Sequence, residues 1–107
     1  MSRHIFDGKL EDQPIRVTVG FDRPSNTFYL HIGWVDPHTG SVVAYASDLN
    51  LAYDPSDWRT IRTFLTGLGI MAPTSVWTEL AFDATAGAGN RVVKHFCNGT
   101  MNELLAW

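Results

Sequence analysis

The segment from Val17 to Trp34 constrains the fold of this 107-residue chain most strongly. Its first half places Val17, Val19 and Phe21 at every second position, with mostly polar residues between them. After the turn Arg23-Pro24-Ser25-Asn26, four more apolar residues alternate in the same way: Phe28, Leu30, Ile32 and Trp34. Proline cannot continue a strand ladder, so the chain turns there. Alternation of this kind predicts two antiparallel strands whose apolar side chains face one core.

Two further strands are expected around this hairpin. Residues 4–6 form a short first strand. Residues 41–46 form a fourth strand after the turn at 36–40, with Val43 and Tyr45 pointing into the core. Half of the chain is therefore predicted to be a run of neighbouring strands.

Two helices are predicted after these strands. Asp54 is expected to cap the first helix, and Gly69 to end it. Helical spacing gives this helix one buried stripe, made of Trp58, Ile61, Leu65 and Leu68. A break at Pro73 precedes a second helix, which starts at Thr74 or Ser75 and ends near residue 86.

Residues 91–97 are expected to form a last strand that pairs back on the sheet, whereas 101–107 fit either a helical turn or a strand. Strands followed by helices are typical of the α+β class. We therefore predict one domain over 1–107, with an antiparallel four- to five-stranded meander sheet and two consecutive helices packed on one face. The expected core is Val17, Val19, Phe21, Leu30, Ile32, Trp34, Trp58, Ile61, Leu65, Leu68, Trp77 and Leu80.

The balance of charges argues against a nucleic-acid partner. Eleven acidic and eight basic residues leave a net charge of −3, whereas nucleic-acid binding needs a basic stripe. The basic residues considered for that weakest alternative are Arg59, Arg62, Arg91 and Lys94. No apolar run reaches the ~20 residues of a membrane span, and the first residues contain no apolar signal region. With a single cysteine, this pattern predicts a cytoplasmic protein without an internal disulfide.

His95 and Cys97 form the pair that comes nearest to a cysteine nucleophile. They are two positions apart, so both project from the same face of a strand, where Asp83 or Asn90 could orient the imidazole. The alternative is that Cys97 is a small buried apolar group. Because no flanking pattern supports catalysis, we predict no catalytic residues.

Cofactor and metal sites are not predicted either. Four histidines lack the short spacings that metal ligands usually show: His4, His31, His38 and His95. The Gly-x-Gly pairs at 67–69 and 87–89 follow helices rather than strands, unlike phosphate-binding loops. We therefore expect neither a cofactor nor a metal.

The polar face of the hairpin carries the residues that we expect to bind a protein. By alternation, the sheet face away from the helices contains Arg16, Thr18, Tyr29, His31 and Val35. Arg16 is expected across from Tyr29 or His31, and Gly33 leaves a flat gap beside them. Tyr and Arg are enriched at the centres of interfaces. Asp36 and Asp48 complete the candidate set, as acids that no helix cap explains. The alternative is a solvated or covered sheet face.

The segment Gly20-Phe21-Asp22-Arg23-Pro24, followed by Phe28-Tyr29, resembles a segment of small uncharacterised proteins carried on bacterial plasmids and phages. The resemblance extends to Gly69-Ile70 with Pro73, and to Gly89-Asn90-Arg91. These are turn and packing residues, so the resemblance implies a genetic setting rather than an activity. Small acidic proteins of that setting often bind a host or defence-system protein, and anti-CRISPR proteins are the best-known class.

We therefore expect a non-enzymatic protein-binding module that inhibits or modulates a host or defence-system complex by covering a functional surface. A homodimer through an exposed strand edge fits the same pattern. The alternative function is a small-ligand-binding or catalytic domain that uses the cleft between sheet and helices, with His31, His95 or Cys97 involved.

Overall fold

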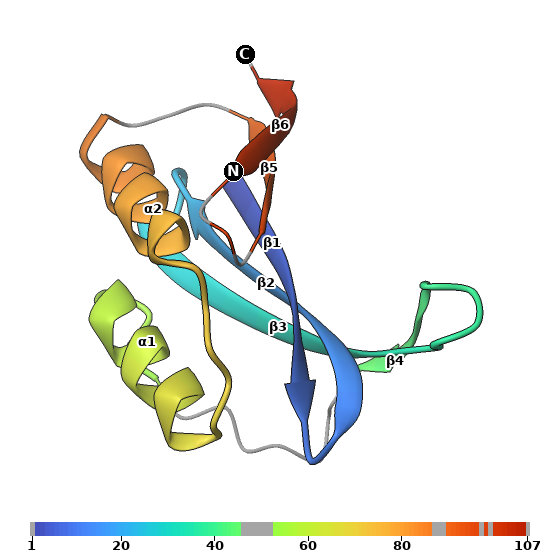
Figure 1. Ribbon diagram of the computed structural model, residues 1–107. Coiled ribbons are helices and arrows are strands. Elements are labelled where there is room, and N and C mark those ends of the chain that lie inside the picture. The colour runs from blue at the N-terminus through green and yellow to red at the C-terminus, as the bar shows by residue number, and fades with distance from the viewer. Residues whose placement is uncertain (1, 46–52, 87–89, 97, 99, 107) are drawn as a thin grey trace.

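A computed structural model of the chain describes residues 2–45, 53–86, 90–96, 98 and 100–106 (Figure 1). These residues form six strands and two helices. In chain order they are β1 (Ser2–Leu10), β2 (Gln13–Asp22), β3 (Thr27–Val35), β4 (Val42–Tyr45), α1 (Trp58–Gly67), α2 (Thr74–Ala86), β5 (Arg91–His95) and β6 (Met101–Ala106). In the segment that fitted either a helical turn or a strand, residues 101–106 form a strand.

The six described strands form one curled sheet in the order β4-β3-β2-β1-β5-β6 (Figure 1). β1 to β4 are antiparallel neighbours in sequence order. β5 runs parallel to β1, where His4 pairs with Val93, and β6 is antiparallel to β5. The α+β class is confirmed, but the predicted antiparallel sheet of four to five strands is wrong, because the sheet is mixed and has six.

The connection through the two helices explains the mixed sheet. After β4, α1 and α2 carry the chain back over the sheet, so β5 enters beside the free edge of β1 in the same direction as β1 (Figure 1). A crossover with helices is long enough for a parallel pair. Alternation within each strand reports which face is buried and contains no information on strand direction.

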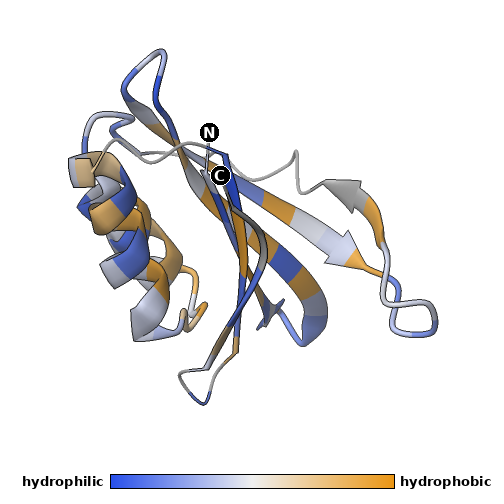
Figure 2. Cartoon of the chain, turned by 90° about the horizontal axis from the view of Figure 1, so that it is seen from above, coloured by the Kyte–Doolittle hydropathy of each residue, from blue (hydrophilic) through white to orange (hydrophobic). Residues whose placement is uncertain are grey.

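Both helices lie on one side of the sheet, and hydrophilic and hydrophobic residues alternate along the strands (Figure 2). The N-cap of α1 is Asp57, not Asp54, because the Asp57 carboxylate accepts a hydrogen bond from the Arg59 N–H at 3.0 Å. Asp54 accepts instead from the Ser56 N–H in the preceding turn. Among the described residues, neither helix is long and apolar enough to cross a membrane.

The predicted Gly69 lies just beyond α1 and closes its last turn. Gly69 has a φ of +77° and its N–H donates to the Thr66 carbonyl, while the Ile70 N–H donates to the Leu65 carbonyl at 3.0 Å. These two bonds are the Schellman arrangement, in which a left-handed residue closes the last helical turn. Ile70 is itself buried, so the helix end is joined to the core.

Most of the predicted core is buried: Val17, Val19, Phe21, Leu30, Ile32, Ile61, Leu65, Trp77 and Leu80. Trp34, Trp58 and Leu68 pack against these residues but are only partly buried. Val43 is 66% exposed, contrary to the prediction, because β4 projects beyond the two helices (Figure 1). The side chain of Tyr45 lies outside the described part of the chain.

Gly20 leaves room for the side chain of Tyr29 to cross over β2 and reach β1. It pairs directly with Tyr29, whose hydroxyl donates to the Ser2 carbonyl at 2.6 Å. A Cβ at position 20 would lie 2.0 Å from that carbonyl oxygen and 2.3 Å from Cζ of the Tyr29 ring. Glycine is therefore required here because the space above its Cα is occupied.

Gly20→Ala is expected to lower the free energy of unfolding by about 1–3 kcal/mol, because the added methyl group overpacks this crossing. Gly67→Ala is the matched control, since no atom lies within 4 Å of the Cβ position there. In a helix, that change is expected to be neutral or to stabilise by up to about 1 kcal/mol. Urea unfolding measures both values, and equal stability of the two variants would contradict the crossing.

Candidate functional site

The sheet face away from the helices, here called the outer face, contains a hollow that brings three predicted residues together. Thr18, Tyr29 and His31 line it, with a volume of about 530 Å³. The other lining residues are Arg3, Ile5, Asp22 and Thr27. β1, β2 and β3 supply the lining, and both helices lie on the other side of the sheet (Figure 2).

Tyr29 is the fixed part of this hollow. Its ring lies 5.4 Å from that of His31, centroid to centroid, and its hydroxyl is held by the Ser2 carbonyl. Burial raises the pKa of Tyr29, although the neighbouring Arg3 guanidinium opposes this effect. The tyrosine therefore stays protonated and offers a rigid aromatic wall rather than a mobile side chain.

Arg16 lies on the outer face but not in the position predicted for it. Its cross-strand partner is Gly33 rather than Tyr29 or His31, because Thr18 pairs with His31. Its Nε donates to Asp7 at 3.0 Å, and its Nη2 donates to the Gly40 carbonyl at 3.1 Å. Arg16 thus holds the β3–β4 turn against β1.

Val35 and Asp36 do not line the hollow. Val35 is next to a register shift at the end of β3, and Asp36 accepts from the His38 N–H at 2.8 Å in the following turn. The flat gap expected at Gly33 is filled, because a Cβ there would meet Val42 at 2.7 Å. Asp48 lies outside the described residues.

The outer face is basic, although the whole chain is acidic. Among its described residues, two are acidic and four are basic: Asp7, Asp22, Arg3, Lys9, Arg16 and Lys94. Asp7 accepts from both Arg16 and Lys94. Burial works against its charge, but these two cations outweigh burial and lower the pKa of Asp7. One carboxylate therefore faces two cations, and the surplus positive charge remains.

A second cluster lies on the buried side of the sheet. It is a chain of hydrogen bonds from Ser75 of α2 through His95 of β5 and His4 of β1 to Asp83 of α2. The three links measure 2.8 Å from Ser75 Oγ to His95 Nδ1, 2.8 Å from His95 Nε2 to His4 Nδ1, and 2.5 Å from His4 Nε2 to Asp83 Oδ2. Both imidazoles and the carboxylate are buried, while Ser75 is half-buried. We call this cluster the buried relay.

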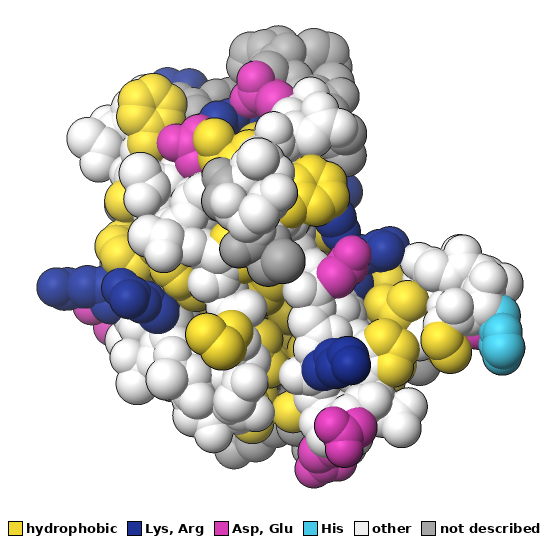
Figure 3. Space-filling model, viewed as in Figure 1, with side chains coloured by type: hydrophobic (Ala, Val, Ile, Leu, Met, Phe, Trp, Pro, Cys, Tyr) yellow, Lys and Arg dark blue, Asp and Glu magenta, His cyan; other side chains and the backbone are white. Residues whose placement is uncertain are grey.

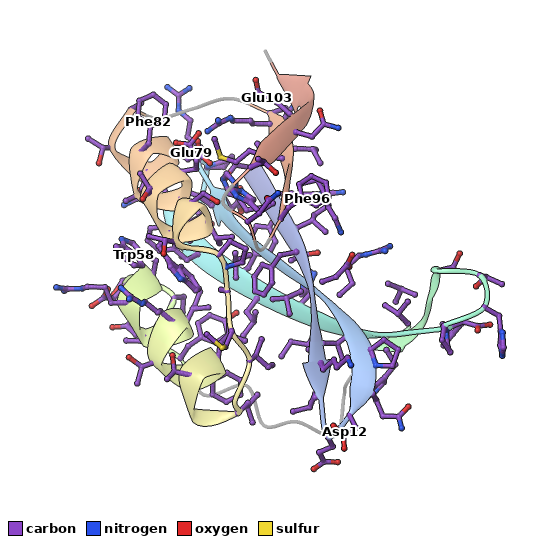
Figure 4. All side chains as sticks on the ribbon, in the orientation of Figure 1. Asp12, Trp58, Glu79, Phe82, Phe96 and Glu103 are labelled. Atoms are coloured by element: carbon purple, nitrogen blue, oxygen red, sulfur yellow. The ribbon has the colours of Figure 1, made fainter. Side chains whose placement is uncertain are left out.

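Arg91 closes the acidic end of the relay. Its Nη1 donates to Asp83 at 2.8 Å, its Nη2 to Glu79 at 2.6 Å, and its Nε to Glu103. Glu79 and Glu103 come from α2 and β6, at the same end of the molecule (Figure 4). Burial opposes the charge of Asp83, but hydrogen bonds from His4 and Arg91 outweigh it and lower the pKa of this carboxyl. Asp83 is therefore ionised.

The ionised carboxylate fixes the direction of the hydrogen bonds. Asp83 can only accept, so His4 donates to it through Nε2. When both imidazoles are neutral, His4 Nδ1 accepts from His95 Nε2, and His95 Nδ1 accepts from the Ser75 hydroxyl. Burial, together with the His4 imidazole, lowers the pKa of His95 to about 4. His95 is therefore neutral and available as an acceptor near pH 7.

Sequence reasoning found part of this cluster. The sequence suggested Asp83 or Asn90 as the group that orients His95, and the structure inserts His4 between His95 and Asp83. Cys97, the other member of the pair considered there, lies outside the described residues, and it is Ser75 that bonds to the imidazole. The available signal for His4 was its shared face with Phe6, since both fall on the buried side of β1.

Three of the four cations considered for nucleic acid are already bound by acids. Arg59 pairs with Asp57, Arg91 with its three carboxylates and Lys94 with Asp7. Among the residues that the structure describes, no group of three or more His, Cys, Asp or Glu side chains is arranged to hold a metal ion. Comparisons with protein-family models, curated proteins and solved structures found no match to this chain.

The relay predicts acid-sensitive stability. The pKa of His95 is about 4 in the folded protein and 6.5 ordinarily, so the unfolded chain binds this proton first as the pH falls. This stabilisation is complete above pH 6.5 and is lost toward pH 4, by about 3 kcal/mol. Urea unfolding across this range measures the loss.

His95→Gln removes the titrating ring, so its stability should fall less steeply with acid than that of the wild type. His38→Gln is the matched control in an exposed turn and should keep the wild-type slope. Identical slopes for the wild type and His95→Gln would show that the relay does not cause the acid sensitivity.

Proposed function

We propose that this chain is a protein-binding module of the cytoplasm whose outer face docks an acidic segment of a partner protein. The observation that carries this role is the hollow of about 530 Å³ on a sheet face that neither helix covers. Its walls combine a guanidinium, an imidazole and a fixed tyrosine ring, and Arg and Tyr are enriched where interfaces bind most strongly.

The charges of the outer face favour an acidic partner. Arg3 is exposed at the rim of the hollow, and Arg16 and Lys94 share the single carboxylate of Asp7 nearby. A partner carboxylate placed in the hollow would pair with Arg3 and lie against Tyr29. Complementary charge of this kind mainly accelerates association and selects among partners.

Exposed apolar side chains do not supply an alternative docking surface on the face seen in Figure 3, where they form separate groups. The large exposed hydrophobic residues of the described chain come from different elements: Val43, Met71, Phe82, Phe96 and Met101. Phe82 and Phe96 lie on opposite sides of the upper part of the molecule in Figure 4. A polar interface centred on the hollow therefore agrees better with the distribution of exposed side chains than an apolar docking surface does.

In this proposal the chain acts by steric occlusion. A rigid sheet face that covers a functional surface of a larger complex blocks that surface without making or breaking a bond. The resemblance to plasmid and phage proteins supports a host or defence-system complex as the target. A second copy of the chain, paired through an exposed strand edge, is the competing occupant.

Arg3→Glu is expected to weaken partner binding by about tenfold or more, because it places a like charge against the acidic segment. Arg62→Glu makes the same charge change on the exposed side of α1 and is the matched control. Tagged wild type and both variants are used to capture proteins from nuclease-treated bacterial lysate, with stoichiometry read by mass spectrometry.

A partner retained by the wild type and Arg62→Glu but lost with Arg3→Glu is the expected result. A partner retained equally by all three would exclude the hollow as the binding site. If only the chain itself is recovered, and gel filtration shows a dimer, the second copy replaces the acidic partner.

A further inference from the structure

We propose that Ser75 is a nucleophile that accepts an acyl group from an activated ester, with His95 as its base and with His4 and Asp83 as the groups that receive the proton's charge. The observation that carries this assignment is the unbroken buried relay, which runs from a half-buried hydroxyl to a buried, ionised carboxylate. It lies on the helix side of the sheet, so it is independent of binding at the outer face.

The geometry matches the roles that nucleophilic catalysis requires. Ser75 Oγ is 2.8 Å from His95 Nδ1, which is hydrogen-bond distance for a serine and its base. The other nitrogen of His95 is held at 2.8 Å by a third group, which fixes the tautomer. Triads are recognised by such geometry and roles rather than by chain order. Here the orienting group is a second imidazole, placed between the base and the carboxylate.

The second imidazole, that of His4, places the transferred positive charge next to a carboxylate. His95 is buried and its pKa is lowered to about 4, so alone it would hold a proton poorly. His4 is 2.5 Å from the ionised Asp83 carboxylate, where a positive charge is compensated. A positive charge that reaches His4 therefore lies beside a carboxylate that His95 does not itself contact.

Acylation of Ser75 forms one bond and breaks another. The Ser75 oxygen forms a bond to the carbonyl carbon of the ester, and the bond between that carbon and the leaving alkoxide or phenoxide breaks. The hydroxyl proton moves to His95 Nδ1, and the Nε2 proton of His95 moves to His4 Nδ1. His4 then carries one positive charge beside Asp83, and the leaving group departs as an anion or takes this proton through water.

Ser75 is in the first turn of α2, a helix of 13 residues. The positive end of the helix dipole stabilises negative charge that develops at the reacting oxygen. The other charged groups around the imidazoles are Arg91, which is bonded to Asp83, and Glu79, which is bonded to Arg91. When the resting relay is protonated by acid, His95 donates to Ser75 instead of accepting from it, so reactivity should fall as the pH is lowered.

The test uses the full chain and p-nitrophenyl acetate. We expect a burst of nitrophenolate that approaches one equivalent and an acetyl group located on Ser75 by peptide mapping. Ser75→Ala should abolish the burst, whereas Ser56→Ala, at an exposed serine bonded to Asp54, should keep it. An acetyl group found equally on exposed lysines or serines, or a burst retained by Ser75→Ala, would overturn the assignment.

The role of the two imidazoles is tested separately, through the rate at which Ser75 is acetylated in histidine variants. His95→Gln should slow acetylation of Ser75 by about 100-fold, the size of a general-base contribution. His4→Gln keeps a hydrogen-bonding group but cannot take the charge, so it should also slow acetylation, although the base His95 remains in place. Circular dichroism confirms folding of each variant. If a histidine variant fails to fold, the comparison of Ser75→Ala with Ser56→Ala decides the assignment.

Discussion

The buried charge of Asp83 is the constraint on which the rest of this structure depends. An isolated carboxylate inside a protein is costly, and removing one partner of a buried pair typically costs about 3–5 kcal/mol. Asp83 comes from α2, and its partners His4 and Arg91 come from β1 and β5. Glu103 of β6 reaches the same arginine. One carboxylate therefore joins the helix layer to the strands that make the sheet mixed.

The same interaction connects the two sides of the sheet. On the buried side, the Ser2 side chain helps to lower the pKa of Asp83 and accepts a hydrogen bond from the Phe21 N–H, while the Ser2 carbonyl accepts from the Tyr29 hydroxyl on the outer face. The crossing exists only because Gly20 has no side chain. Tyr29, which forms a wall of the outer hollow, is thus bonded to β1, the strand that contains His4. Recognition on one face and proton transfer on the other are separate proposals, but they share this framework.

The sequence was sufficient to predict elements that depend on neighbouring residues. Alternation identified the hairpin of β2 and β3, and helical spacing with the break at Pro73 located α2. Contacts between distant residues were not predictable in this way. His4 and His95 are 91 positions apart, and His4 and Asp83 are 79 apart. Nothing in local periodicity indicates that these three polar side chains face one another.

The predictions for the outer face that were wrong also relied on local pattern alone. Alternation placed Thr18, Tyr29 and His31 on the correct face, but it does not define which residues lie opposite each other. Register decides that, and it gives Arg16 a glycine as its partner. Lys94 was also missed there, because its place depends on the parallel pairing of β5 with β1. Pairing between strands, rather than the pattern within them, completes the site.

The direction of the hydrogen bonds in the buried relay is tested most directly by ¹⁵N NMR of the histidine side chains. At neutral pH we expect His95 to carry its proton on Nε2 with a bare Nδ1, and His4 to carry a proton on the Nε2 that faces Asp83. A proton on Nδ1 of His95, or averaging of both nitrogens as in a freely exchanging imidazole, would contradict the relay and the reactivity inferred for Ser75.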